Sequence, residues 1–223
     1  MTDRYSDAPK PSYRVIPSRF PPISVFDTVA TASDLEAVMD LAGWTSDRLV
    51  ADRLARLDRA EWVFGQPNSS IVMAAFLHVP PSGMRFNSPE LGAWYAAADL
   101  DTAVVEVAHH LRREAVARSI ETETRTYRVY TSVLEGSYLD IRGQRTGRSD
   151  LYDATSYAAS QVFGEAIRSG GGNGLIYDSI RKVGGTNVVA YRPRTVTGIV
   201  QTLHLRITIT AGSKRIEVER LSV

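Results

Sequence analysis

Residues 83–106 read Gly-Met-Arg-Phe-Asn-Ser-Pro-Glu-Leu-Gly-Ala-Trp-Tyr-Ala-Ala-Ala-Asp-Leu-Asp-Thr-Ala-Val-Val-Glu, and no other stretch is as informative about the fold. It places a cation (Arg85), an aromatic ring (Tyr95) and a carboxylate (Glu106) on three consecutive local elements. A turn precedes the cation, an apolar run typical of a short strand holds the ring, and an Asp-initiated helix holds the carboxylate. The spacing predicts that Arg85 and Tyr95 face one cleft.

A second block of polar and glycine residues follows further along the chain. Ser179 and Asn187 flank a glycine-bearing turn, and both side chains can form hydrogen bonds. A glycine-rich turn is equally typical of a simple hairpin, so the block is weak evidence when it stands alone. Its members are Gly174, Leu175, Tyr177, Ser179, Arg181, Gly184, Gly185 and Asn187.

Each candidate residue also has a purely structural interpretation. On a helical wheel, Glu106 lies nearly opposite the apolar stripe of its helix, which is typical of a solvated carboxylate paired with His110 four residues on. Arg85 is compatible with a surface position at the start of a strand. Tyr95 is compatible with a half-buried core position beside a tryptophan. Residue pattern alone leaves these alternatives open.

Composition narrows the class of protein. The chain has 223 residues, 43% of them apolar, and a formal net charge of +1, so no basic field favours a nucleic-acid partner. It has no cysteine, and its four histidines lack metal-site spacing, so we expect no metal. No long apolar run or signal-peptide segment is present, and we expect a cytoplasmic protein without a membrane partner.

Hydrophobic periodicity predicts an α+β fold, because short strands and a few helices follow one another without regular βαβ alternation. Five prolines in residues 1–25 predict an extended lead-in, with a strand possible at 13–16. We expect residues 1–70 to form this lead-in and accessory helices, and residues 71–223 to form the core, together as one compact unit. The predicted helices are 33–40, 46–60, 101–118 and 154–168, and the predicted strands are 71–78, 94–98, 127–134, 138–141, 175–177, 187–191, 200–210 and 215–221.

Several separated motifs occur in an order that resembles the RES-domain family, known mainly as toxins of bacterial toxin–antitoxin pairs. They are Gly-x-Arg-Phe-Asn, a Tyr ten residues after the Arg, Ala-x-x-Glu, Gly-Leu-x-Tyr-x-Ser-x-Arg and Gly-Gly-x-Asn. The resemblance covers roughly residues 75–193, and Tyr13-Arg14 resembles the opening Arg of the family. One departure is Asp178, which stands where the family commonly has Pro before the Ser.

The resemblance implies a fold, a substrate and a partner. The fold would be similar to that of ADP-ribosyltransferases, a split β core with flanking helices around a central NAD cleft. The activity would be cleavage of the nicotinamide–ribose bond of NAD, a consumed substrate, without a metal. The partner would be an antitoxin with an Xre-like DNA-binding segment, which blocks the cleft.

The resemblance also assigns roles to residues. Glu106, Arg85 and Tyr95 would be catalytic. Glu106 would stabilise the cationic ribose by its charge and would accept a hydrogen bond from a ribose hydroxyl. Arg85 would hold the oxygens of the dinucleotide, Tyr95 the nicotinamide ring, and Ser179 with Asn187 the amide or ribose edge. We expect a toxin that transfers ADP-ribose to a protein acceptor. The alternatives are an NAD glycohydrolase or phosphorylase that depletes cellular NAD, and a non-enzymatic module that binds the antitoxin.

Overall fold

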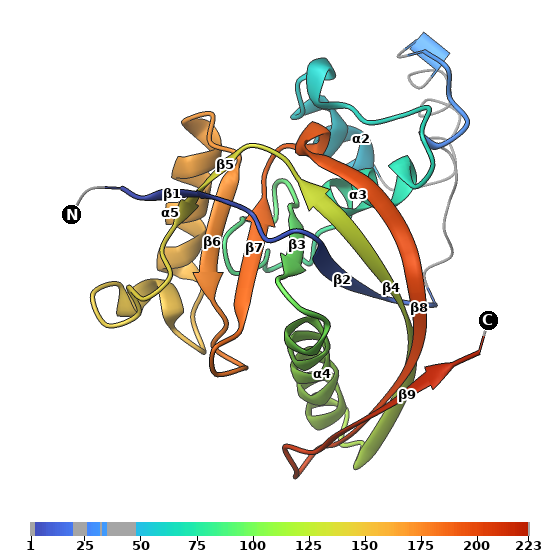
Figure 1. Ribbon diagram of the computed structural model, residues 1–223, viewed down its shortest axis with the longest axis vertical. Helices are drawn as coiled ribbons and strands as arrows, with labels where there is room; N and C mark the ends of the chain where they lie inside the picture. Colours follow the sequence, from blue (N-terminus) through green and yellow to red (C-terminus); the bar gives the residue numbers. More distant parts are fainter. Residues whose placement is uncertain (1–2, 20–25, 32, 35–47, 223) are drawn as a thin grey trace.

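The computed structural model describes residues 3–19, 26–31, 33–34 and 48–222 (Figure 1). In this part of the chain the strands form one mixed sheet in the order β1-β5-β6-β7-β3-β2-β4-β8-β9, in which β5 and β6 pair in parallel and the other neighbours are antiparallel. The α+β prediction is confirmed. The strands are β1 (Tyr5–Asp7), β2 (Ser12–Pro17), β3 (Trp94–Ala97), β4 (Thr122–Leu134), β5 (Ser137–Asp140), β6 (Gly174–Asp178), β7 (Thr186–Ala190), β8 (Val196–Thr210) and β9 (Ile216–Leu221).

The helices lie against different parts of this sheet. Figure 1 shows α4 in the hollow of the long curved β4–β8 ribbon and α5 beside β6, while α2 and α3 lie together near one end of the ribbon. The α-helices are α2 (Arg48–Ala55), α3 (Ser69–Leu77), α4 (Leu100–Ala117) and α5 (Ala158–Ser169), and the short 3₁₀ helices are η2 (Arg59–Glu61), η3 (Ser149–Tyr152) and η4 (Pro193–Thr195).

The sheet has a weak joint at its centre. Strands β2 and β3 pair at one position, Tyr13 with Ala97, whereas β2 pairs with β4 along its whole length. The sheet is thus divided into a half that holds β1, β5, β6, β7 and β3 and a half that holds β2, β4, β8 and β9. Because few backbone hydrogen bonds close the joint, the two halves can diverge there and leave space between them.

The long helix α4 follows the predicted apolar stripe. Val104, Ala108, Leu111 and Ala115 recur at helical spacing and are buried against β2, β4 and β8. The helix begins slightly earlier than we predicted, because the cap is Asp99 and not Asp101. The Asp99 carboxylate accepts a hydrogen bond from the backbone N–H of Thr102 at 2.8 Å, which satisfies a free donor of the first turn.

The prediction of a strand at residues 71–78 is wrong, because this segment belongs to helix α3. A continuous apolar run does not distinguish a buried strand from a buried helix, and α3 is buried on nearly all sides. Its first turn is capped by Asp27, whose two carboxylate oxygens accept the backbone N–H groups of Asn68 and Ser70. A cap so distant in sequence leaves no local signal.

The remaining predicted elements fall close to the observed ones, with shifted boundaries. Strand β2 confirms the strand expected at 13–16, β4 and β8 are longer than predicted, and α2 is shorter. The helix expected at 154–168 begins later, since the Asp153 carboxylate accepts the N–H groups of Thr155 and Ser156 and forms a turn first. Most of the helix expected at 33–40 lies outside the described residues. The division of the chain at residue 70 stays a prediction.

Candidate functional site

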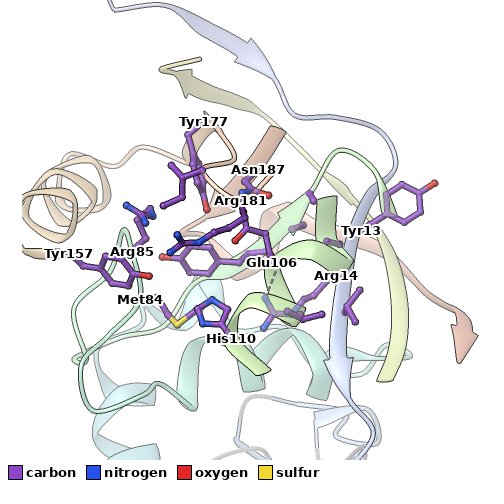
Figure 2. Close-up of a pocket in the computed structure, with 17 residues that line it drawn as sticks. Tyr13, Arg14, Met84, Arg85, Glu106, His110, Tyr157, Tyr177, Arg181 and Asn187 are labelled. Atoms are coloured by element: carbon purple, nitrogen blue, oxygen red, sulfur yellow. Dashed lines mark hydrogen bonds between the residues drawn. The ribbon is translucent and has the colours of Figure 1, made fainter. Parts of the chain in front are cut away.

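A cavity of about 210 Å³ opens at the joint between the two halves of the sheet (Figure 2). Its walls come from β2, β3, β6, β7 and α4, and from the segments at residues 84–85, before α5 and after β6. Four of the five residues singled out in the sequence line it, and Ser179 stands directly behind one of them. The lining residues are Tyr13, Arg14, Val15, Met84, Arg85, Tyr95, Ala96, Ala97, Ala103, Glu106, Val107, His110, Tyr157, Tyr177, Ile180, Arg181 and Asn187.

Glu106 is held from one side. Its Oε1 atom accepts two hydrogen bonds, from Ser179 Oγ at 2.7 Å and from Asn187 Nδ2 at 2.7 Å. Among the described residues no group donates to Oε2, so this oxygen keeps its capacity to accept a hydrogen bond. The solvated pairing with His110 that periodicity allowed is therefore not the arrangement in the structure. A carboxylate fixed by two donors in a cavity is suited to stabilising positive charge.

The turn between β6 and β7 presents the serine. Ser179 Oγ also accepts the backbone N–H groups of Arg181 and Lys182 at 3.1 and 3.0 Å, which fixes the hydroxyl so that its proton points to the carboxylate. Gly185 allows the turn to lie against α4, since a Cβ there would lie 2.9 Å from a side-chain oxygen of that helix. Lys182 Nζ donates to Asp99 Oδ1 at 2.8 Å and ties the turn to the helix cap.

Asp178 ends β6 immediately before this turn. Its Oδ2 atom accepts the backbone N–H of Gly143 at 2.7 Å, so the side chain holds the loop that follows β5. The departure from proline at this position is thus compatible with a well-bonded serine turn.

Arg85 lies in the cavity wall with one of its guanidinium nitrogens, Nη1, engaged by the protein. The side chain is buried, and Nη1 donates to the carbonyl oxygens of Leu151 and Asp153 at 3.1 and 2.8 Å. Its guanidinium also lies 4.6 Å from the centre of the Tyr157 ring, at a distance typical of a cation–π contact. Arg85 therefore fixes the segment before α5 and presents the remainder of its guanidinium to the cavity.

Tyr95 lines the cavity from β3, and its hydroxyl is fully used. The hydroxyl donates to Asn87 Oδ1 at 2.8 Å and accepts the backbone N–H of Phe86 at 2.9 Å. Burial raises the pKa of this hydroxyl, so it stays protonated at neutral pH. The ring, and not the hydroxyl, is the part of Tyr95 that remains available to a ligand.

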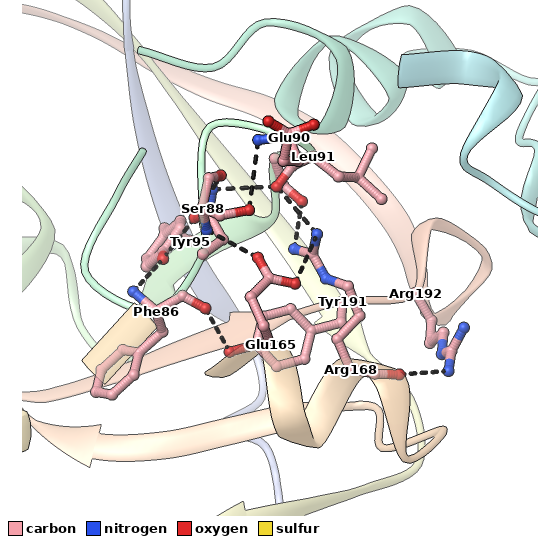
Figure 3. Close-up of polar contacts among 11 residues, drawn as sticks. Phe86, Ser88, Glu90, Leu91, Tyr95, Glu165, Arg168, Tyr191 and Arg192 are labelled. Carbon is pink, nitrogen blue, oxygen red and sulfur yellow. Dashed lines mark hydrogen bonds and ion pairs between the residues drawn. The ribbon is translucent and has the colours of Figure 1, made fainter. Parts of the chain in front are cut away.

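The segment that carries Arg85 is held against α5 (Figure 3). Ser88 donates its backbone N–H to Glu165 Oε1 at 2.8 Å, and Arg168 Nη1 donates to the Leu91 carbonyl at 3.0 Å. Arg168 and Glu165 lie one turn apart and contact each other at 3.7 Å. This wall of the cavity is thus built from loops that are braced by charged hydrogen bonds.

Sequence reasoning gave no role to several lining residues. Arg14 Nη1 donates to the Tyr95 carbonyl at 2.8 Å, and burial lowers the pKa of its guanidinium to about 10, which leaves it charged at neutral pH. Arg14 and Arg181 lie inside the motifs and were within reach of a motif argument. No local sequence pattern marks Tyr157 as a site residue, because only the path of the chain brings it to the cavity.

The charges around the cavity favour an anionic ligand. The guanidinium groups of Arg14, Arg85 and Arg181 line it, against the single carboxylate of Glu106. In the described part of the chain no three His, Asp or Glu side chains gather as metal ligands do, and the expected absence of a metal stays a prediction. No described helix combines the length and the apolar character that a membrane span requires.

Comparison with known proteins assigns the chain to a family. The sequence model of the RES domain matches residues 53–210, so the chain belongs to the RES domain family and the resemblance inferred from the motifs is confirmed. An uncharacterized protein of Sinorhizobium fredii, y4oC, is 25% identical over 201 residues, which cover 87% of this chain and 80% of that protein. A chain in the crystal structure of the M. tuberculosis MbcT–MbcA toxin–antitoxin complex is 18% identical with a TM-score of 0.47, covering 89% of this chain and 86% of that chain.

Proposed function

We propose that this protein is the toxin component of a toxin–antitoxin system, cleaves the nicotinamide–ribose bond of NAD and transfers ADP-ribose to a protein acceptor. Membership of the RES domain family supports the toxin class. The observation that carries the chemistry is the state of Glu106, whose Oε1 is held by Ser179 and Asn187 while Oε2 has no described donor.

The proposed reaction breaks the bond between the ribose C1′ and the nicotinamide nitrogen. The electron pair of this bond leaves with the nitrogen, so a neutral nicotinamide departs and positive charge develops on the ribose ring. The fixed negative charge of Glu106 stabilises this transition state more than the ground state, and Oε2 accepts a hydrogen bond from a ribose hydroxyl. An acceptor nucleophile then bonds to C1′ and loses its proton.

The other lining residues orient the substrate in this proposal. The ring of Tyr95 offers a face to the nicotinamide, and buried apolar contact with Tyr177 and Ile180 helps to exclude water. Arg85 faces the dinucleotide from the opposite wall. A cavity of about 210 Å³ holds one end of a dinucleotide, so the remainder lies along its mouth.

The acceptor distinguishes the leading proposal from hydrolysis or phosphorolysis of NAD. We propose incubating the purified protein with NAD labelled in the adenylate half, in a cell extract. Label retained on a protein band supports transfer to a protein. Label found only in free ADP-ribose or its phosphate contradicts transfer and identifies water or phosphate as the acceptor.

We further propose a cytoplasmic location and an Xre-like antitoxin that covers the cavity. A toxin of this class needs a partner that restrains it, and a small Xre-like gene beside this one would encode that partner. Expression of the chain alone should deplete cellular NAD and stop growth, and co-expression of the neighbouring gene should restore both. Growth arrest without NAD loss would contradict the proposed activity.

A further inference from the structure

Arg181 occupies a position that differs from those of the other cavity arginines. It lies in the turn after β6, is half-buried and lines the cavity, where Figure 2 draws it with Arg85 and Glu106. Its backbone N–H is fixed by Ser179 Oγ at 3.1 Å, and the next residue, Lys182, is tied to the cap of α4. The base of the side chain is therefore held in place by hydrogen bonds on both sides.

The guanidinium of Arg181, in contrast, has no hydrogen-bond or ion-pair partner among the described residues. Arg14 donates to a backbone carbonyl of β3, and Arg85 donates to two carbonyls in the segment before α5. A guanidinium offers five N–H donors in a planar fork, and none of those of Arg181 is used within the described part of the chain. Of the three arginines, Arg181 keeps the largest unused capacity for binding an anion.

The charge of Arg181 acts on the α4 side of the cavity. Burial lowers the pKa of His109 to about 4, and the nearby charge of Arg181 is the next cause of this lowering. His110, which lines the cavity, also has its pKa lowered by burial, so neither histidine adds a positive charge at neutral pH. An anion at this side of the cavity therefore meets Arg181 as its principal cation.

We propose that Arg181 is the substrate-binding residue that recognises a phosphate of the dinucleotide. This inference rests on the proposed function, since the diphosphate carries the negative charge of NAD. In NAD, one phosphate is attached to C5′ of the same ribose whose C1′ carries nicotinamide. Ser179 links Glu106 to the backbone of Arg181, because its hydroxyl donates to Glu106 Oε1 and accepts a hydrogen bond from the backbone N–H of Arg181. The planar fork of the Arg181 guanidinium, in the same cavity as the Glu106 carboxylate, is suited to bidentate phosphate binding.

The test compares a ligand that carries the diphosphate with one that lacks phosphate. Dissociation constants of ADP-ribose and of nicotinamide riboside are measured by calorimetry for wild type, Arg181→Gln and Arg181→Lys. For Arg181→Gln we expect ADP-ribose to bind about 10- to 100-fold more weakly, because hydrogen bonds to a charged group are lost. Nicotinamide riboside should bind as to wild type, and Arg181→Lys should fall between, since it keeps the charge and loses the fork.

Controls separate this proposal from the general field of the protein and from the proposed function. Arg113 is an exposed arginine of α4 outside the cavity, and Arg113→Gln should change ADP-ribose affinity by less than about twofold. Equal weakening of both ligands in Arg181→Gln, or weakening of neither, would overturn the proposal while leaving NAD as the substrate. A wild-type protein that binds neither ligand would overturn the proposed function and this inference with it.

Discussion

The two walls of the cavity use their polar groups differently. On the wall formed by α4 and the turn after β6, Glu106 receives both donors on one oxygen, and the guanidinium of Arg181 has no described partner. On the loop wall, Arg85 donates to two backbone carbonyls and the hydroxyl of Tyr95 bonds to the loop on both sides. The first wall therefore leaves a carboxylate oxygen and a whole guanidinium for a ligand, whereas the second also uses Arg85 Nη1 and the Tyr95 hydroxyl to hold its own shape.

This contrast separates residues whose proposed role is confined to the substrate from residues that also maintain the shape of the site. Both walls contain residues that the motifs singled out, yet a motif does not say how the hydrogen bonds of its residues are used. We expect substitutions on the helix wall to change turnover or affinity with little change in stability. Substitutions on the loop wall should change stability as well. The following predictions test that contrast, beginning with the strongest effect on stability.

The largest stability effect should come from Arg85→Ala. The change removes a buried guanidinium and leaves the carbonyls of Leu151 and Asp153 without their donor, so we expect a loss of about 2–4 kcal/mol in the free energy of unfolding. Chemical denaturation measures the loss, with Arg113→Gln as the control, and an unchanged denaturation midpoint would remove the contrast between the walls.

The second effect concerns the pH dependence of stability at His109, a residue of helix α4 outside the cavity lining. Burial, followed by the charge of Arg181, lowers the pKa of His109 to about 4, below its ordinary value of 6.5. The folded state thus binds fewer protons, and its stability is fully present above pH 6.5 and declines as pH falls toward 4. We expect a decline of about 1–2 kcal/mol, which allows for solvent screening of a partly exposed ring. The decline should be smaller in His109→Gln, where His110, whose pKa burial also lowers, still contributes.

Asp140 on β5 responds to pH in a lower window. Hydrogen bonds from Arg142 lower the pKa of its carboxyl to about 2, below its ordinary 3.8. Its contribution is present above pH 3.8 and is lost as pH falls toward 2. The change in the free energy of unfolding between pH 7 and pH 4 should therefore become smaller in His109→Gln. It should not depend on protonation of Asp140. A wild-type protein with constant stability across that range would contradict the assignment to His109.

The smallest effect on stability should come from removing the ion pair between Lys182 and Asp99, which connects the turn after β6 to α4. Lys182→Gln removes an ion pair whose side chains are 31% and 47% exposed, so the stability change should be at most about 1 kcal/mol. The amides of Arg181 and Lys182, which donate to Ser179 Oγ, should nevertheless exchange hydrogen faster. Arg206→Gln, which breaks an exposed pair on β8 and β9, is the matched control and should leave these amides unaffected. Unchanged exchange in Lys182→Gln would show that the tie does not hold the turn.

Much of the fold was predictable because periodicity reflects burial. The stripe of α4 and the short apolar runs of β3, β6 and β7 correspond to the faces that are buried. The helix at 69–77 was missed because an apolar run of this length suits either structure and its cap, Asp27, lies far away in sequence. The local sequence pattern thus predicts which residues are buried. It predicts less well which elements they pack against.

The sequence predicted which residues belong to the site, but not which contacts they make. Motif order singled out Glu106, Ser179 and Asn187, and the structure joins them by two hydrogen bonds. Periodicity alone placed Glu106 on a solvated face, because a helical wheel does not include the turn that packs beside the helix. Tyr157 reaches the cavity through the path of the chain before α5, for which the sequence has no short-range signature.

NAD cleavage by Glu106→Gln is the sharpest test of the role proposed for the carboxylate. Glutamine keeps the shape and nearly the helix propensity of the side chain and removes the charge, so the melting temperature should stay within about 2 °C of wild type. NAD should still bind, whereas turnover should fall about 100-fold or more, which corresponds to roughly 2.7 kcal/mol of lost transition-state stabilisation. A variant that melts as wild type and cleaves NAD at the wild-type rate would contradict this role and leave Glu106 a structural residue of the cavity wall.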